Sequence, residues 1–428
     1  MREMKDSGIE WIGQIPKDWD VVPHKRVMHK VKKICEQYSG EDIISLTMNG
    51  VIKRNLTAGG KMPTSFDGYQ YVKPNDLLLC LFDIDVTPRC VGVVKDYGVT
   101  SPAYSRFVMH DGYYNAYYDY LLRAIDDDKV FVHLSKNLRS SLTESDFGAI
   151  KTCVPSLAEQ KRIVTFLDAQ CAEIDTVLEK TRASIEEYKK LKQAVITQAV
   201  TKGIRGDRPM KDSGIEWIGE IPESWAVSSV RYIGQLQNGI SKGGEFFGKG
   251  FPFVSYGDVY KNYELPHSVS GLIDTTEDER TTYSVEYGDI FFTRTSETIE
   301  EVGFSCVCKR SIPNATFAGF IIRLRPFCAD EKILTDYAKY YFRGEHIRAY
   351  LVKEMNLVTR ASLGQTLLKG MSVIVPPKSV QKEIAEYLDE KCEGIDDLIA
   401  KKQQYLTEIE NYKKSLIYEY VTGKTEVV

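Results

Sequence analysis

Two long stretches of the chain carry apolar residues three, four, seven and eleven positions apart, the pattern of a helix with one apolar face. The first follows Pro155 and ends at Gly203, and the second follows Pro376. Each stretch of about 45 residues would span roughly 65 Å as a helix, more than one domain's core can cover. The apolar stripe of each helix therefore needs a partner helix. The stripes consist of Ile163, Leu167, Ile174, Leu178, Ile185, Tyr188 and Val195, and of Ile384, Leu388, Ile395, Ile399, Leu406, Ile409 and Leu416.

The chain is a tandem duplication. The string MKDSGIEWIG occurs at residues 4–13 and again at 210–219, an offset of 206, whereas residues 160–203 align without a gap on 381–424 at an offset of 221. The centre of the second half is therefore 15 residues longer. Pseudo-twofold symmetry makes the helix of one repeat the expected partner of the other, packed antiparallel. We expect the helix-pair seam to include Ile174, Ile185, Tyr188, Ile395, Leu406 and Ile409.

The centre of each half has a mixed pattern. Strand-like runs at residues 76–82 and 289–293 occupy corresponding places, and helical patterns follow at 117–124 and 334–342. The sequence therefore predicts an α/β (α+β) fold, with two tandem globular domains separated by two long helices that form an antiparallel coiled coil.

Five segments follow from these patterns. We expect globular domains at residues 1–154 and 210–375, helical spacers at 155–203 and 376–428, and a linker at 204–209, where glycine and proline interrupt the helix.

Composition adds two constraints. Hydrophobic residues make up 43% of the chain, and no apolar run approaches the roughly 18 residues that a membrane span needs. The first residues lack the apolar core of a signal peptide, so we expect a cytoplasmic location. The net charge is −4, with 30 basic and 28 acidic residues in 1–209 and 26 and 32 in 210–428. A nucleic-acid-binding role would therefore require positive charge sorted onto one face, and a partner that shares phosphate neutralisation.

Motifs for catalysis are weak. Ser101-Pro102-Ala103-Tyr104 resembles the loop with which adenine methyltransferases hold a flipped base, but the amide side chain of that loop is missing. No glycine-rich cofactor loop follows a strand, the nine cysteines form no CxxC pair, and the six histidines show no ligand spacing. We therefore expect no catalytic residue, no metal site and no cofactor in this chain.

Both ends of both halves resemble the specificity (S) subunit of type I restriction-modification enzymes. The resemblance rests on the doubled KDSGIEWIGxIPxxW entries, the junctions at residues 154–163 and 375–384, and the Leu-Asp and Ile-Asp pairs that follow them. The closing strings Ala-Val-Thr-Lys-Gly and Tyr-Val-Thr-Gly-Lys complete it, so the resemblance covers the whole chain.

The resemblance implies a non-catalytic subunit that binds double-stranded DNA. Each centre would be a target recognition domain that reads one half of a split sequence. The paired helices would hold the two domains apart and dock two modification (methyltransferase) subunits, on which S-adenosylmethionine is expected. The resemblance leaves open whether restriction subunits join through the modification subunits.

Candidate DNA contacts are side chains that suit bases or phosphates and lie in loop-like, aromatic-flanked stretches. For any one of them, a solvated surface charge is the alternative. Arg139 and Arg360 match across the repeat, which favours a shared phosphate or scaffold role. The candidates are Lys53, Arg54, Lys61, Arg89, Tyr104, Arg106 and Arg139 in the first half, and Lys242, Lys249, Tyr256, Lys261, Arg294, Arg323 and Arg360 in the second.

Two other functions are compatible with parts of the sequence. A non-catalytic adaptor whose two domains bind proteins would show no salt-dependent affinity for DNA. A self-contained methyltransferase is disfavoured by the missing cofactor loop, and binding of S-adenosylmethionine to the isolated chain would distinguish it.

Overall fold

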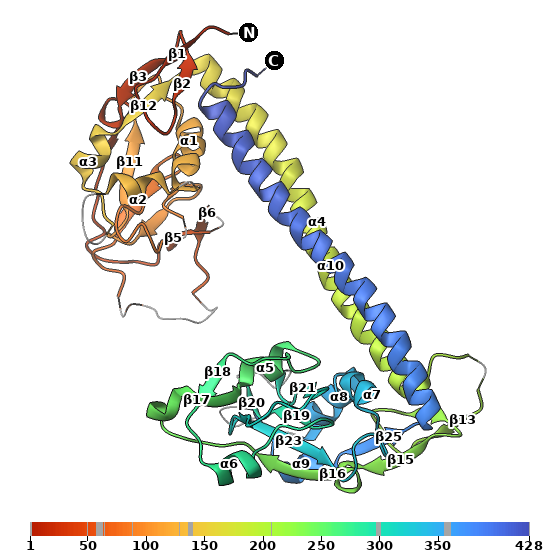
Figure 1. Ribbon diagram of the computed structural model, residues 1–428. Coiled ribbons are helices and arrows are strands. Elements are labelled where there is room, and N and C mark those ends of the chain that lie inside the picture. The colour runs from red at the N-terminus through yellow and green to blue at the C-terminus, as the bar shows by residue number, and fades with distance from the viewer. Residues whose placement is uncertain are drawn as a thin grey trace. The chain divides into compact units, whose positions relative to one another are not determined.

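The computed structural model describes residues 2–48, 50–56, 63, 65–87, 89–127, 129–135, 140–206, 208–296, 301–354 and 361–427. The chain divides into two compact units (Figure 1). Unit 1 comprises Met1–Arg182 and Gln404–Val428, and unit 2 comprises Ala183–Gln403. Each unit therefore contains one of the two globular centres and a part of both long helices. The five segment boundaries predicted from the sequence stay a prediction.

Unit 1 is built on an antiparallel four-stranded sheet with the strand order β4-β11-β8-β9. Its strands are β4 (Met28–Lys30), β11 (Ser105–Met109), β8 (Leu77–Leu79) and β9 (Val91–Val93), and helix α1 (Asn115–Asp127) packs against β9. Smaller pairs are β1 (Met4–Asp6) with β2 (Gln14–Pro16), β3 (Asp20–Pro23) with β12 (Lys151–Val154), β5 (Ile44–Thr47) with β6 (Gly50–Lys53), and β7 (Gln70–Val72) with β10 (Gly98–Thr100). Short helices are η1 (His24–Arg26), α2 (Val130–Leu134) and α3 (Glu144–Ala149).

Unit 2 repeats this sheet with the order β16-β23-β19-β21. The strands are β16 (Gly234–Asn238), β23 (Ile321–Pro326), β19 (Ile290–Thr293) and β21 (Ser305–Val307), and α7 (Thr335–Tyr341) packs against β21. Further strands are β13 (Met210–Asp212), β14 (Glu220–Pro222), β15 (Ala226–Ser229), β17 (Phe247–Val254), β18 (Gly271–Ile273), β20 (Thr295–Ser296), β22 (Thr316–Phe317), β24 (Ala361–Ser362) and β25 (Ser372–Val375). The remaining short helices are η2 (Val230–Tyr232), η3 (Gly244–Phe246), α5 (Tyr256–Lys261), α6 (Glu277–Thr282), α8 (Glu345–Glu354) and α9 (Gln365–Gly370).

The two sheets share one register. Leu78 of β8 lies opposite Arg106 of β11, and Phe291 of β19 lies opposite Arg323 of β23. The strand-like runs and the helical patterns predicted in the centres thus correspond to β8, β19, α1 and α7. The sequences of the two centres have diverged, but their central sheets keep the same strand order and the same strand pairing.

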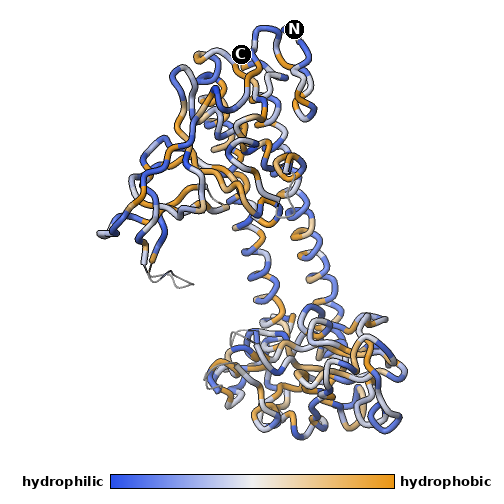
Figure 2. Tube along the Cα trace, turned by 90° about the vertical axis from the view of Figure 1, so that its left-hand side faces the viewer, coloured by the Kyte–Doolittle hydropathy of each residue, from blue (hydrophilic) through white to orange (hydrophobic). Residues whose placement is uncertain are grey.

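The long helices are α4 (Leu157–Lys202) and α10 (Lys378–Val421), and they pack antiparallel in both units. In unit 1, Asp175 pairs with Lys413 at 2.6 Å, and Arg182, further along α4, pairs with Glu410, earlier in α10. In unit 2, Lys192 pairs with Asp396 at 2.6 Å. Apolar positions recur along both helices (Figure 2). The predicted α/β fold with an antiparallel helix pair is therefore confirmed.

Burial along the helices follows the predicted stripes. Leu178 in unit 1 is 4% exposed and Ile185 in unit 2 is 5% exposed. The other seam residues are partly buried, because a pair of helices can cover only one side of each partner. These partly buried residues are Ile174, Tyr188, Ile395, Leu406 and Ile409.

In each unit a buried glutamine connects the globular centre to the start of the long helix that follows it in the sequence, α4 in unit 1 and α10 in unit 2. In unit 1, the side-chain oxygen of Gln160 accepts the backbone N–H of Tyr114 at 2.8 Å, and its amide donates to the Pro155 carbonyl. In unit 2, Gln381 accepts the N–H of Leu334 at 2.7 Å and donates to the Pro376 carbonyl. Gln160 and Gln381, which are equivalent across the repeat, therefore make the same two kinds of hydrogen bond.

A buried tyrosine fastens each centre to the end of the other long helix. Tyr117 donates its hydroxyl to the carbonyl of Val421, near the end of α10, at 2.7 Å. Tyr337 does the same to the carbonyl of Val200, near the end of α4, at 3.1 Å. Both tyrosines are fully buried. Each centre is thus held by the beginning of one helix and the end of the other.

Both copies of MKDSGIEWIG contact the end of a long helix. In unit 1 this hairpin receives the end of α10, because the Tyr418 hydroxyl donates to the Trp11 carbonyl and Lys424 donates to the Ile12 carbonyl at 3.0 Å. In unit 2 the second copy receives the end of α4, where Lys202 donates to the Ile218 carbonyl at 3.5 Å. Gly203, with φ +82°, ends α4 as the sequence predicts.

Candidate nucleic-acid interface

Two of the arginines predicted to contact DNA lie inside the domains. Arg106 is 6% exposed, and its guanidinium donates to Asp76 at 2.6 Å and to the Tyr71 carbonyl at 3.1 Å. Arg323 is also 6% exposed; it donates to the Ser284 carbonyl at 2.6 Å and to the side chain of Gln237. Burial lowers the pKa of Arg323.

This placement corrects the prediction for Arg106 and Arg323. A guanidinium whose donors are used by buried acceptors of its own domain cannot enter a DNA groove without breaking those bonds. We therefore remove both residues from the candidate interface. Arg106 connects β11 to Asp76 and to Tyr71 of β7. Arg323 connects β23 to Ser284 and to Gln237 of β16.

Three further candidates are engaged in contacts within their domains. Arg89 donates to the carbonyls of Val91 at 2.8 Å and Met48 at 3.3 Å, and burial lowers its pKa. Lys242 pairs with Glu279 at 2.6 Å. Lys53 pairs with Asp42 at 2.5 Å, although its side chain stays more than half exposed. Of these three, Lys53 has the most accessible charge.

The two candidate tyrosines differ in their surroundings. Tyr104 packs beside the small cluster of Ile44, Val51 and Leu78, and burial raises its pKa. Tyr256 begins α5, where its ring stacks on Tyr260 at 5.8 Å between centroids. Arg54 is exposed directly after β6, and its backbone N–H donates to the Ile43 carbonyl. These contacts leave the DNA-binding role of all three a prediction.

Arg294 is the candidate whose placement best suits a reading role. Its backbone is fixed on both sides, since its N–H donates to the Phe320 carbonyl at 2.9 Å and its carbonyl accepts the N–H of Leu363 at 2.7 Å. Within the described part of the chain its guanidinium has no hydrogen-bond or ion-pair partner. A fixed backbone that carries an uncommitted guanidinium is what recognition of guanine or phosphate requires.

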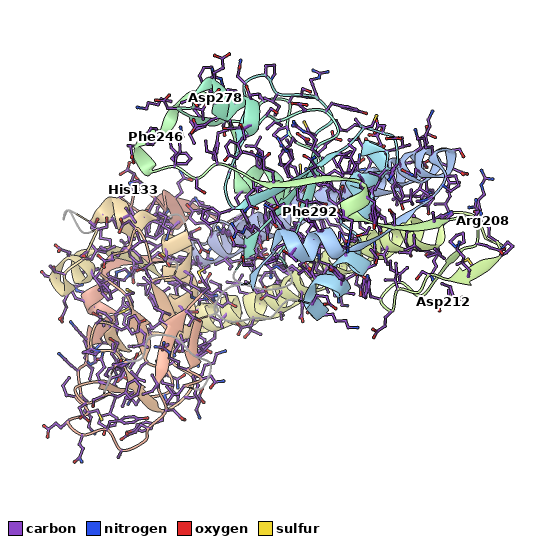
Figure 3. The ribbon with its side chains drawn as sticks, turned by 90° about the horizontal axis from the view of Figure 1, so that it is seen from below. His133, Arg208, Asp212, Phe246, Asp278 and Phe292 are labelled. Atoms are coloured by element: carbon purple, nitrogen blue, oxygen red, sulfur yellow. The ribbon has the colours of Figure 1, made fainter. Side chains whose placement is uncertain are left out.

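Lys249 and Lys261 are exposed and, among the described residues, likewise lack an internal partner. Lys249 lies in β17, which begins directly after η3. Phe246 of η3 lies at the edge of unit 2 together with Asp278, whereas Phe292 lies within the body of that unit (Figure 3).

Three candidates lie outside the described residues. These are Lys61, Arg139 and Arg360, and their roles stay predictions.

Sequence reasoning missed polar side chains at the same end of the sheet as Arg294. Gln365 donates its amide to the side chain of Asn238 at 3.0 Å, and Asn238 lies opposite Ile322 of β23. Asparagine and glutamine amides are adenine-reading groups. They come from segments 127 residues apart, so only the folded sheet brings them together.

The described residues contain neither a cluster of metal-binding side chains nor a helix that could span a membrane. Across these ranges, His, Cys, Asp and Glu side chains form no group of three or more that could bind a metal ion. In the same part of the chain, every helix is too short or too polar to cross a bilayer.

Comparison with known proteins finds similarity to one family. The sequence model of the family described as Type I restriction modification DNA specificity domain matches residues 222–410. One relative is a protein of Methanocaldococcus jannaschii that is named, as a proposed assignment, the type I restriction enzyme MjaX specificity subunit. It is 24% identical, and the match covers 97% of this chain and 96% of that protein. The type I restriction enzyme EcoKI specificity subunit of Escherichia coli is 22% identical over 67% of this chain and 60% of its own length.

A solved structure from work on complex assembly and conformational transition of the type I R-M system shares the fold. Its TM-score is 0.71 at 14% identity, and the match covers 96% of this chain and 99% of that chain. The family model, the relatives and the fold agree with the resemblance of the repeated ends. The chain is therefore similar to type I restriction-modification specificity subunits, in the sequence of residues 222–410 and along nearly its whole length.

Proposed function

We propose that this chain reads a bipartite double-stranded DNA target, with one half of the target bound by the centre of unit 1 and the other by the centre of unit 2. The proposal rests on one observation. The two units share a central sheet but carry different residues where β8 and β19 end and the following loops begin. The carbonyls of Leu81 and Arg294 accept equivalent backbone bonds, from Leu142 and Leu363, yet one side chain is apolar and the other cationic. Such a difference on one scaffold would let each unit read a different half-site.

We further propose that two modification (methyltransferase) subunits dock on the long helices. Unit 1 exposes Val177 (39%) and Tyr412 (57%), and unit 2 exposes their repeat equivalents Leu398 (43%) and Leu191 (48%). Large apolar side chains held in water at matched positions suit a docking surface that occurs once in each unit. Two equivalent surfaces would accept two copies of one partner.

Methyl transfer is assigned to those partners. S-adenosylmethionine would be bound by the modification subunit, and this chain would supply sequence recognition without a catalytic residue. Restriction subunits would join through the modification subunits, and the assembled enzyme would act in the cytoplasm, where the DNA is.

Charge supports a shared mode of DNA binding. The chain carries a net charge of −4, and its candidate cations Lys53 and Lys242 are paired with internal carboxylates, so the charge available to bind phosphates is limited. Phosphate neutralisation would then depend in part on the modification subunits. We expect the complex to bind its target more tightly than this chain alone.

The test is DNA binding by the purified complex of this chain with its modification subunits. A labelled duplex that contains the methylated motif should bind at about 50 mM salt, and the affinity should fall by tenfold or more at about 200 mM. The modification subunits without this chain are the control, and they should not distinguish the motif from an unrelated duplex. An adaptor that binds only proteins would give no such DNA affinity, and that result would refute the proposal.

A further inference from the structure

A rigid turn in unit 2 presents an aromatic ring to solvent. The turn spans Ala318 to Ile321, and its ends are joined because the Ile321 N–H donates to the Ala318 carbonyl at 2.9 Å. Phe320 lies at the tip, with its side chain 63% exposed. The Phe320 carbonyl accepts the N–H of Arg294, so the tip lies directly beside the backbone of Arg294.

Neighbouring strands hold this turn on both sides. The N–H of Ala318 donates to the Val254 carbonyl at 3.1 Å, and the N–H of Gly239 donates to the Ile321 carbonyl at 3.1 Å. A side chain at Gly239 would come within 2.3 Å of the backbone of Phe317 and Ala318, so glycine permits this close approach. The backbone that carries the ring is therefore fixed in place.

The same turn exists in unit 1. The register of the central strands places Ser101 to Tyr104 where unit 2 has Ala318 to Ile321, and the Tyr104 N–H donates to the Ser101 carbonyl at 3.2 Å. The buried Gln70 braces this turn by donating to the carbonyls of both end residues. The residue at the tip is Ala103, which is exposed. One scaffold position thus carries a methyl group in one unit and a phenyl ring in the other.

An isolated exposed apolar residue is common on protein surfaces and needs no function. Phe320 differs because its backbone is fixed and because it is bonded to the backbone of Arg294, a cation without a partner among the residues that the structure describes. In addition, the equivalent position of unit 1 carries a different residue, Ala103. In DNA grooves, a phenylalanine ring makes an apolar contact with the 5-methyl group of thymine, the most apolar feature of the base edges.

We propose that Phe320 is a specificity-determining contact of unit 2, and that its ring packs on the 5-methyl group of a thymine in the half-site which this unit reads. Ala103 is too short to make the same contact, so the tip reads its base pair differently in unit 1. The inference rests on the proposed DNA-reading function and names the chemistry that one side chain recognises.

The test uses the complete complex with its modification subunits and the duplex identified from the methylation motif of the wild-type protein. Each thymine of the second half-site is replaced in turn by deoxyuridine, which removes only the methyl group. One replacement should weaken binding by the wild-type complex about fourfold, the loss expected for one buried methyl group. The same replacement should not weaken binding by the Phe320→Ala complex, whose affinity for the unmodified duplex should already be about tenfold lower.

Phe327→Ala is the matched control. Phe327 follows β23 as Phe320 precedes it, and its exposure of 62% is nearly the same, but it lies at the opposite end of the strand. This variant should bind like the wild type and keep its sensitivity to deoxyuridine. Methylation motifs provide a second readout, because Phe320→Ala should relax one position of the second half-site and leave the first half-site unchanged.

Each outcome bears on the inference. If the wild-type complex binds the motif but no deoxyuridine replacement weakens it, or if Phe320→Ala binds like Phe327→Ala, the contact is absent and only the inference fails. If Phe320→Ala weakens binding to all duplexes alike, the ring supports the fold or a phosphate contact and the inference also fails. If the wild-type complex selects no sequence at all, the proposed function fails with it.

Discussion

Replacement of Gln381 by leucine tests how the centre of unit 2 is fastened to the start of α10. The side chain of Gln381 is fully buried and makes three hydrogen bonds to backbone groups. It accepts the N–H of Leu334 at 2.7 Å and donates to the carbonyls of Lys332 at 2.9 Å and Pro376 at 2.8 Å. Leucine has a similar volume but can make none of these bonds, and it leaves little room for a replacing water.

The expected loss follows from the groups left without partners. A buried backbone group that loses its only partner costs about 1–3 kcal/mol. Two of the three bonds are partly exposed and one is buried, which gives a loss of about 3–5 kcal/mol. Gln160→Leu, which removes two bonds at the equivalent place in unit 1, should cost less, about 2–4 kcal/mol.

Hydrogen exchange followed by mass spectrometry measures this loss where it occurs. The amide of Leu334 donates to Gln381 and should exchange on the order of a hundredfold faster in the Gln381→Leu variant. Gln404→Leu is the control, because that amide is exposed and bonds to Glu408 on the surface of α10. A Gln381→Leu protein whose peptides over residues 330–342 exchange within twofold of the wild-type rate would refute the assigned role.

Three further outcomes are expected. Ile185→Asp should lower thermal stability by several kcal/mol because it buries a charge at a site 5% exposed, whereas Leu191→Asp, at a site 48% exposed, should melt like the wild type; equal melting temperatures would contradict the seam. The pKa of His346 is lowered to about 3 by burial, so the folded state binds fewer protons than the unfolded state below about pH 6.5. His346 should account for a loss of about 2 kcal/mol of stability between pH 7.5 and 5, beside the loss from His24, whose pKa burial lowers to about 4, and His346→Phe should reduce the slope in urea titrations; an unchanged slope would count against it. Arg294→Ala should weaken DNA binding by the complex about tenfold without a change in melting temperature, whereas Arg323→Ala should lower the melting temperature; the opposite pattern would reverse their assignments.

The long helices could be predicted because their signal is local and repeated. An apolar stripe sustained from Ile163 to Val195 has few structural solutions, and Gly203 marks its end. The partner and its direction followed from the duplication, since the equivalent stripe had to face the first. Contacts such as Asp175 with Lys413 then agree with the antiparallel pairing.

The candidate site was harder to predict, because strand residues alternate between faces and tertiary packing decides which face is buried. Arg106 and Arg323 lie in aromatic-flanked stretches that suggested DNA contacts, yet both point into their domains. Tyr117 and Tyr337 carried no signal, because each bonds to a helix end that is distant in sequence. The turn tips at Ala103 and Phe320 became comparable only once the sheet registers were known.

The central claim is that two independent readers share one scaffold, and exchange of one centre tests it most directly. Residues about 20–154 would be replaced by the corresponding centre of another specificity subunit, and methylated adenines would be mapped by sequencing in cells that also express the modification subunit. We expect a two-part motif in which one half changes and the other half stays the same. An active complex in which both halves change, or neither does, would contradict the account.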